Sequence, residues 1–133
     1  MRELESWFKG LADVTRLRIL NLLLAGELCG CDIQYVLAAS QPNVSRHLTY
    51  LKHAGLVLDR RDGYRVFYRL AEAKAGKKKL LFEFLQLAFQ GEESLRQDRE
   101  RLRHAVRDGS CTLGEAPPFF PAGRLKAGVS ARG

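Results

Sequence analysis

The fold of this chain is decided by the stretch Ser40-Gln41-Pro42-Asn43-Val44-Ser45-Arg46-His47-Leu48. Ser40 can cap the start of a helix, because its hydroxyl can accept a hydrogen bond from a first-turn N–H group, and proline is tolerated in that turn. Val44, Leu48 and Leu51 recur at the spacing of one buried helix face. The sequence therefore predicts a helix that starts after Ser40 and ends at about Gly55.

The polar side chains of this helix fit a DNA-reading role. A recognition helix buries one face and offers polar side chains from the other to the major groove. Asparagine and glutamine can pair with adenine and arginine with guanine, while serine and the helix N-terminus suit phosphate oxygens. We expect His47 to contact phosphate and His53 to be a plain surface residue. The predicted DNA-binding residues of the helix are Gln41, Asn43, Ser45, Arg46, His47, Thr49 and Lys52.

After this helix the hydrophobic period changes from helical to alternating. Leu56-Val57-Leu58 is β-prone, Asp62-Gly63 is a hairpin turn signal, and residues 64–70 alternate apolar with basic or aromatic side chains. A narrow β-tip that carries arginines fits a minor groove or a row of phosphates. The sequence thus predicts a β-hairpin wing whose DNA-binding residues are Arg60, Arg61 and Arg65. The alternative is an ordinary helix and hairpin whose charges are only solvated.

The remaining segments are mostly helical. Leu4, Trp7, Phe8 and Leu11 form a helix stripe, and Asp13 can cap a second helix that Gly26 ends. A short third helix is expected from about Cys29 to Ala38, and a long helix, which Gly91 can bend, from about Lys77 to Arg107. We predict a mainly α fold with a β-hairpin wing, a winged helix-turn-helix. It occupies residues 1–107, and residues 108–133, rich in glycine, alanine and proline, are expected to form a flexible tail.

Charge and composition narrow the function. The formal net charge of the 133-residue chain is +7, and residues 40–79 carry the whole basic excess. Such clustering favours a polyanion partner, nucleic acid before a membrane surface. The sequence has no stretch long and apolar enough for a membrane span and no apolar signal segment at its start. We therefore expect a cytoplasmic protein with no membrane partner, and the odd number of cysteines argues against a disulfide framework.

Two cysteines stand just before the predicted recognition helix. Cys29 and Cys31 lie in Glu27-Leu28-Cys29-Gly30-Cys31-Asp32, and thiolates bind soft ions. On a regular helix these side chains would point about 200° apart, so one ion would reach both only if the helix start were distorted. Gly30 eases such distortion, which would shift the following helix. Two buried structural thiols are the alternative. Cys111 is either a third ligand, from its own chain or a partner, or an incidental thiol.

With these motifs, the sequence resembles the ArsR/SmtB family of winged-helix metal-sensing repressors over about residues 4–106. The segments that carry the resemblance are residues 11–20, Glu27 to Asp32, Ser40 to Leu48, and Gly55-Leu56-Val57 running into Arg60-Arg61-Asp62-Gly63. The resemblance implies a homodimer through the first and last helices that binds a palindromic operator on double-stranded DNA. It also implies release when trivalent arsenic or antimony binds cysteine thiolates, here Cys29, Cys31 and Cys111, with no organic cofactor.

The sequence departs from that family in informative ways. The best-known arsenic pattern has a third cysteine where this chain has Gln34, and no cysteine precedes Cys29, as the cadmium/lead branch would require. No zinc-type Asp-x-His stands on the predicted last helix. Sensing of cadmium, lead or thiol oxidation by the same fold stays open as an alternative. We expect no enzyme, because the parallel-sheet pattern that a thiol oxidoreductase would need does not precede Cys29.

Overall fold

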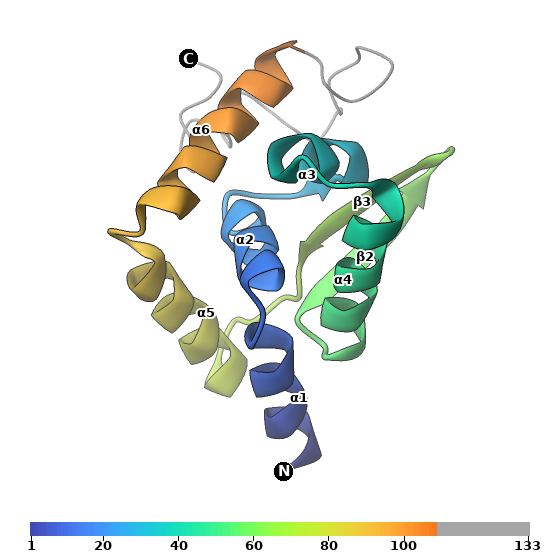
Figure 1. The fold of residues 1–133 in the computed structure, drawn as a ribbon. Coiled ribbons are helices and arrows are strands. Elements are labelled where there is room, and N and C mark those ends of the chain that lie inside the picture. Colours follow the sequence, from blue (N-terminus) through green and yellow to red (C-terminus); the bar gives the residue numbers. More distant parts are fainter. Residues whose placement is uncertain (109–133) are drawn as a thin grey trace.

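The computed structural model describes residues 1–108. Its elements are α1 (Arg2–Leu11), α2 (Val14–Leu23), β1 (Leu28–Cys29), α3 (Gly30–Leu37), α4 (Gln41–His53), β2 (Val57–Asp62), β3 (Arg65–Leu70), α5 (Gly76–Phe89) and α6 (Glu93–Asp108). Helix α2 lies at the centre, with α5 and α6 on one side and the β2–β3 hairpin on the other (Figure 1). This arrangement confirms the predicted mainly α fold with a β-hairpin wing. Of the tail predicted over residues 108–133, Asp108 instead ends α6, and the rest lies outside the described residues.

Helices α2 and α4 begin where their capping residues predicted. The Asp13 carboxylate accepts a hydrogen bond of 3.0 Å from the Arg16 amide, and the Ser40 hydroxyl accepts one of 3.3 Å from the Asn43 amide. These bonds satisfy first-turn N–H groups that have no partner within the helix. The apolar face of α4 is buried as expected, at Val44, Leu48 and Leu51.

The core forms around α2. Ile19, Leu20 and Leu22 have no exposed surface, and they belong to one cluster with buried side chains of α3, α4 and α6. Tight packing of this kind fixes the relative positions of the helices, because a packed interior deforms little. The recognition helix is therefore held on a rigid body.

The sheet has one strand more than the sequence predicted. Its strand order is β1-β3-β2, and both pairs are antiparallel. Strand β1 has two residues only, and it occupies the start of the segment expected as the third helix. The hairpin loop is Gly63-Tyr64, one residue later than the predicted turn, because Asp62 pairs with Arg65. Gly63 has a φ of +68°, which suits glycine at the first position of a two-residue hairpin loop.

The long helix predicted from Lys77 to Arg107 is wrong, because the structure has two helices there. Gly91 lies between them with a φ of +85°, a conformation that helical residues do not adopt. The chain turns at this point, so α6 packs back against α2 and α3 and buries Leu102, Ala105 and Val106. In α5, by contrast, Leu85 alone is buried.

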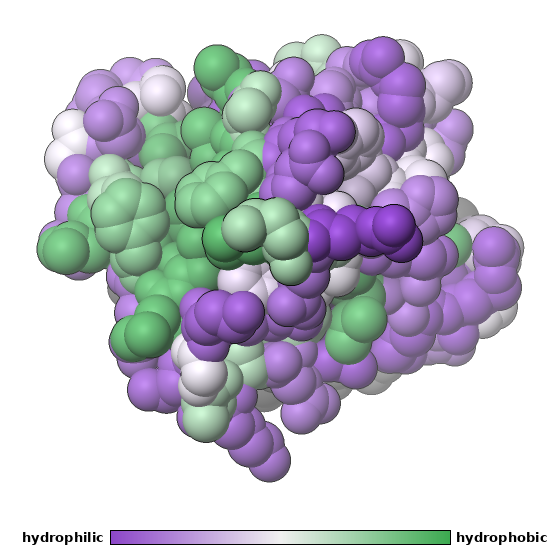
Figure 2. Space-filling view, turned by 90° about the horizontal axis from the view of Figure 1, so that it is seen from below, coloured by the Kyte–Doolittle hydropathy of each residue, from purple (hydrophilic) through white to green (hydrophobic). Residues whose placement is uncertain are grey.

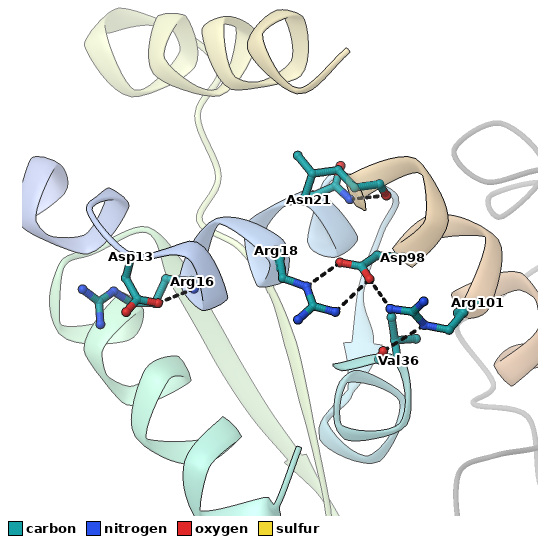
Figure 3. Close-up of polar contacts among 8 residues, drawn as sticks. Asp13, Arg16, Arg18, Asn21, Val36, Asp98 and Arg101 are labelled. Carbon is teal, nitrogen blue, oxygen red and sulfur yellow. Dashed lines mark hydrogen bonds and ion pairs between the residues drawn. The ribbon is translucent and has the colours of Figure 1, made fainter. Parts of the chain in front are cut away.

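A buried carboxylate fastens α6 to the body (Figure 3). Asp98 is 1% exposed and accepts two hydrogen bonds from Arg18 of α2, of 2.7 and 2.9 Å. Arg101 also donates to Asp98, and its Nε donates to the Val36 carbonyl at the end of α3 at 3.1 Å. Because two guanidinium groups donate hydrogen bonds to the Asp98 carboxylate, they offset the free-energy cost of burying its charge. The network joins α6 to both α2 and α3.

Candidate DNA interface and thiol site

The outward face of α4 carries most of the polar side chains that the sequence selected. Gln41, Arg46, Thr49 and Lys52 are exposed, and Asn43 and Ser45 are half-buried. The Arg46 guanidinium contacts the Asn43 side-chain oxygen, and the Lys52 ammonium lies 2.9 Å from Asp59 of β2. The first of these contacts lies at the start of α4, where a recognition helix meets bases. The arrangement therefore presents hydrogen-bonding groups and positive charge on one surface.

His47 is the exception on this helix. Its residue is only 9% exposed, and its Nδ1 lies 3.3 Å from the Arg16 guanidinium and 3.9 Å from the Asp13 carboxylate. Burial lowers the pKa of His47, and the charges of Arg46 and Arg16 lower it further against the opposing effect of Asp13. A ring held between helices argues against the phosphate contact predicted for His47. His53, by contrast, is exposed as expected.

Arg16 holds the recognition helix against the first two helices. Its Nε and Nη2 donate to the carbonyls of Gly10 and Lys9 at 2.9 and 3.0 Å, at the end of α1. The same guanidinium lies 4.1 Å from the centroid of the Tyr50 ring of α4. One side chain thus joins α1, α2 and α4. This role of Arg16 could not be predicted from the sequence, where the residue stands in a family motif without a function of its own.

The three arginines predicted for the wing differ in their surroundings. Arg60 donates from Nε to the Glu27 carboxylate at 3.0 Å, and its guanidinium carbon lies 4.8 Å from the centroid of the Phe67 ring. Arg61 is exposed, whereas Arg65 is half-buried. Successive side chains of a strand point to opposite faces, so Arg60 and Arg61 face different sides of the hairpin. The tip itself presents Tyr64, which is 72% exposed.

The two cysteines converge where β1 ends and α3 begins. Cys29 has an extended backbone, with φ −79° and ψ 152°, and the helix starts at Gly30. The angle expected for two residues on a regular helix is therefore wrong for this pair, because Cys29 lies before the helix. The Cα atoms are 5.4 Å apart, and the sulfurs are joined as a disulfide, which the odd number of cysteines had argued against. Both sulfurs can thus meet at one point without distortion of α3.

The pair is set against the wing rather than against solvent. Cys29 is 2% exposed and Cys31 half-buried, and both pack with Phe67 of β3, which has no exposed surface. Gly30 also approaches the wing closely, because a Cβ at this position would lie 3.4 Å from the Tyr68 ring. The site is therefore in direct contact with β3.

Within residues 1–108, no group of three or more histidine, cysteine, aspartate or glutamate side chains is arranged to hold a metal ion. The described part of this chain thus brings no third side chain of these types to Cys29 and Cys31. Cys111, the candidate third ligand, lies outside the described residues. Among the described helices, none combines the length and apolar character needed to cross a membrane.

An apolar surface lies on the side of the molecule away from the wing. Figure 2 shows this area on the face seen from below, where α1 and α5 lie in Figure 1. It includes exposed large side chains of α1 (Leu4 and Phe8) and of α5 (Leu80, Phe84 and Leu87). Contiguous apolar surface of this kind commonly marks a contact between proteins.

Comparison with known proteins identifies the family. The family model described as bacterial regulatory protein, arsR family, matches residues 13–58. The arsenical resistance operon repressor of Staphylococcus aureus is 43% identical over 72 residues, which are 54% of this chain and 69% of that protein. The chain belongs to the ArsR family.

Other ArsR-family relatives agree. The arsenic resistance transcriptional regulator ArsR1 of Pseudomonas putida is 54% identical over 65 residues, 47% of this chain, and the match spans only 50% of that regulator's length. A homodimeric winged helix-turn-helix DNA-binding domain of Mycobacterium bovis, described as a possible ArsR-family regulator, has a TM-score of 0.58 and 33% identity. That comparison covers 65% of this chain and 78% of the other.

Two further residues of this ArsR-family site, Glu27 and Phe67, had no role predicted from the sequence. Glu27 was quoted within the cysteine motif without a role, although its place two residues before Cys29 puts both on the same side of an extended segment. Phe67 was noted only as part of the alternating pattern. Its central position between β1 and β2 depends on a pairing of distant segments that local patterns do not reveal.

Proposed function

We propose that this ArsR-family protein is a transcriptional repressor that binds a palindromic operator as a homodimer. The polar face of α4, led by Gln41, Asn43 and Arg46, would read bases, with Ser45, Thr49 and Lys52 near the backbone. The wing would add Arg61 and Arg65. A two-fold dimer presents two such surfaces to two half-sites, which is how helix-turn-helix dimers read palindromes. The basic excess of residues 40–79 supports the same partner.

The dimer would form through α1 and α5. These helices expose apolar side chains, whereas α6 uses its own apolar side chains inside the protomer. A Phe84→Glu variant places a charge in the middle of the exposed face. We expect it to sediment as a monomer, with Glu83→Gln, a change at the neighbouring charged residue, as a dimeric control. Dimeric Phe84→Glu protein would contradict the assigned interface.

The effector that we propose is trivalent arsenic or antimony, bound by the thiolates of Cys29 and Cys31. The convergence of the two sulfurs at the start of α3 is the observation that carries this proposal. Thiolates are preferred ligands of such soft ions, and the pair must be reduced before it binds one. The names of the relatives, arsenic and arsenical resistance regulators, point to the same class of effector. Binding would release the operator.

Operator binding tests the proposal. A duplex is selected from a randomised pool by the reduced protein, and its gel shift is measured with and without arsenite. We expect arsenite to abolish the shift of the wild type and to leave that of Cys29→Ser unchanged. Gln34→Ala is the matched control on α3 and should respond like the wild type. A wild-type complex that persists in arsenite, like that of Cys29→Ser, contradicts the proposed effector.

The third ligand is a separate question for X-ray absorption. We propose Cys111, so the number of sulfurs around bound arsenic should fall from three to two in Cys111→Ser. Two sulfurs in both proteins would make Cys111 a bystander. Gln34→Cys then places a thiol three residues after Cys31, on the same side of α3, and should supply the missing sulfur.

A second candidate function is a response to thiol oxidation, which the disulfide between Cys29 and Cys31 favours. In this case peroxide, rather than arsenite, would change operator affinity, and a reductant would restore it. Cadmium is a further soft ion that two thiolates would accept. Parallel titrations of the reduced protein with arsenite, cadmium and peroxide separate the three effectors.

A further inference from the structure

A row of three side chains crosses the sheet from the thiol pair to the wing. The register places Cys29 of β1 opposite Phe67 of β3, and Phe67 opposite Arg60 of β2. Residues directly opposed on neighbouring strands lie on the same face of a sheet. Cys29, Phe67 and Arg60 therefore stand side by side in this order, and the Arg60 guanidinium carbon lies 4.8 Å from the centroid of the Phe67 ring.

Arg60, the last residue of this row, forms an ion pair with Glu27, which lies two residues before Cys29. The Glu27 carboxylate accepts the 3.0 Å hydrogen bond from Arg60 Nε, and its side chain is only 9% exposed. A buried carboxylate with a cationic partner is screened little by salt and is costly to separate from that partner. The segment 27–29 is thus joined to the wing three times, by backbone pairing, by the packing of Cys29 on Phe67, and by the Glu27–Arg60 ion pair.

We infer that Phe67 and the Glu27–Arg60 pair couple the chemical state of Cys29 to the position of the wing, an inference that rests on the proposed function of the thiol pair. Cys29 and Phe67 are 2% and 0% exposed and pack against each other, so a change in what the Cys29 sulfur binds alters the packing of the Phe67 ring. We expect either the Phe67 ring to move or the segment 27–29 to withdraw from β3. Both movements change the position of Arg60, which is a positioning residue in this scheme.

Hydrogen exchange tests this coupling without DNA. The full chain is compared with the pair as a disulfide, reduced, and reduced with arsenite. Between the disulfide and the reduced protein, we expect the amide exchange of residues 57–70 to change while that of α4 stays the same. A change confined to α3 and α4 would overturn the inference. The comparison of disulfide with thiols needs no response to arsenite, so it holds even if the proposed effector is wrong.

Operator affinity gives a second test. Effector coupling in proteins is typically about 5- to 150-fold, and we expect Arg60→Gln to reduce the ratio of effector-free to effector-bound affinity to about threefold or less. Arg61→Gln is the matched control, because it removes a charge from the other side of the same strand. It should weaken both states and keep the wild-type ratio. An unchanged ratio in Arg60→Gln would overturn the inference.

Two further results distinguish a loss of coupling from poor folding and from a wrongly assigned effector. Because Arg60→Gln leaves Glu27 buried without this partner, the double variant Glu27→Gln/Arg60→Gln checks that lost coupling does not reflect poor folding. It should melt like the wild type and still show the reduced ratio. If arsenite leaves wild-type affinity unchanged, the proposed effector fails, and the exchange comparison alone decides the coupling.

Discussion

The recognition helix and the wing belong to the same candidate DNA surface, but they are held in different ways. Helix α4 is fastened to α1 and α2 by Arg16 and His47 and buries Val44, Leu48 and Leu51 in the core. The hairpin joins that core through Val57 at the base of β2, whereas Phe67 of β3 lies against the thiol pair. The difference suggests a division of labour, in which the helix sets operator affinity and the wing receives the signal.

The largest expected effect is a loss of stability when the contacts of Arg16, which fasten α4 to α1 and α2, are removed. Arg16→Ala removes hydrogen bonds to two carbonyls of α1 and the contact with His47, so we expect it to lower the free energy of unfolding by about 2–4 kcal/mol. Arg61→Ala, on the exposed wing, should change it by no more than about 0.5 kcal/mol. Urea denaturation of both variants measures these values. Equal stability of the two variants would contradict the claim that Arg16 fastens α4 to α1 and α2.

The next effect concerns base reading by the helix. If Arg46 contacts a base, Arg46→Ala should weaken binding to the selected operator by about 1–3 kcal/mol, with a smaller loss on a random duplex of the same length. Fluorescence anisotropy at one salt concentration measures both affinities. Equal losses on the two duplexes would assign Arg46 to phosphate and leave base reading to other residues of α4.

Arg60 and Arg61, which are adjacent in β2, are expected to differ in their contribution to DNA binding. Arg61 is exposed, so Arg61→Gln should reduce the slope of log affinity against log salt by about 1, the value for one phosphate contact. Arg60 already pairs with Glu27, and Arg60→Gln should reduce the slope less. Anisotropy titrations across a salt series give both slopes. The reverse order would mean that Arg60 leaves Glu27 to contact DNA.

The smallest expected effect is a pH dependence of stability that arises from His47 of α4. The pKa of His47 is lowered in the folded protein, chiefly by burial, so the unfolded chain binds more protons in the window below the usual histidine value of about 6.5. Stability should therefore fall as pH decreases from 7 to 5, and His47→Gln should flatten that dependence. Thermal melts across this range measure the slope. An identical slope in the variant would contradict the buried position of the ring.

Local features of the fold were predictable, and features that depend on distant pairing were not. Asp13 and Ser40 cap the helices that follow them, and the spacing of Val44, Leu48 and Leu51 revealed the buried face of α4. Strand β1 has only two residues, too few for any periodic signal, and it exists because it pairs with β3.

The same limit explains what was wrong in the site. The angle between Cys29 and Cys31 depends on where α3 begins, and β1 sets that boundary by pairing with the wing. Arg60 and Arg61 look equivalent in the sequence, because only the strand register assigns one of them to Glu27 and Phe67. Gly91 was expected only to bend the last helix, since the apolar spacing continues on both sides of the glycine, whereas the structure ends one helix before it and begins another after it.

The most direct test of the whole account follows thiols and operator binding in the same sample. Reduced protein is saturated with its selected, fluorescently labelled duplex, arsenite is added stepwise, and free thiols are counted at each step alongside the anisotropy. We predict that the loss of the Cys29 and Cys31 thiols and the release of DNA proceed together, at the same ratio of arsenite to protein. Full loss of those thiols with the anisotropy unchanged would contradict the claim that this cysteine pair controls DNA binding.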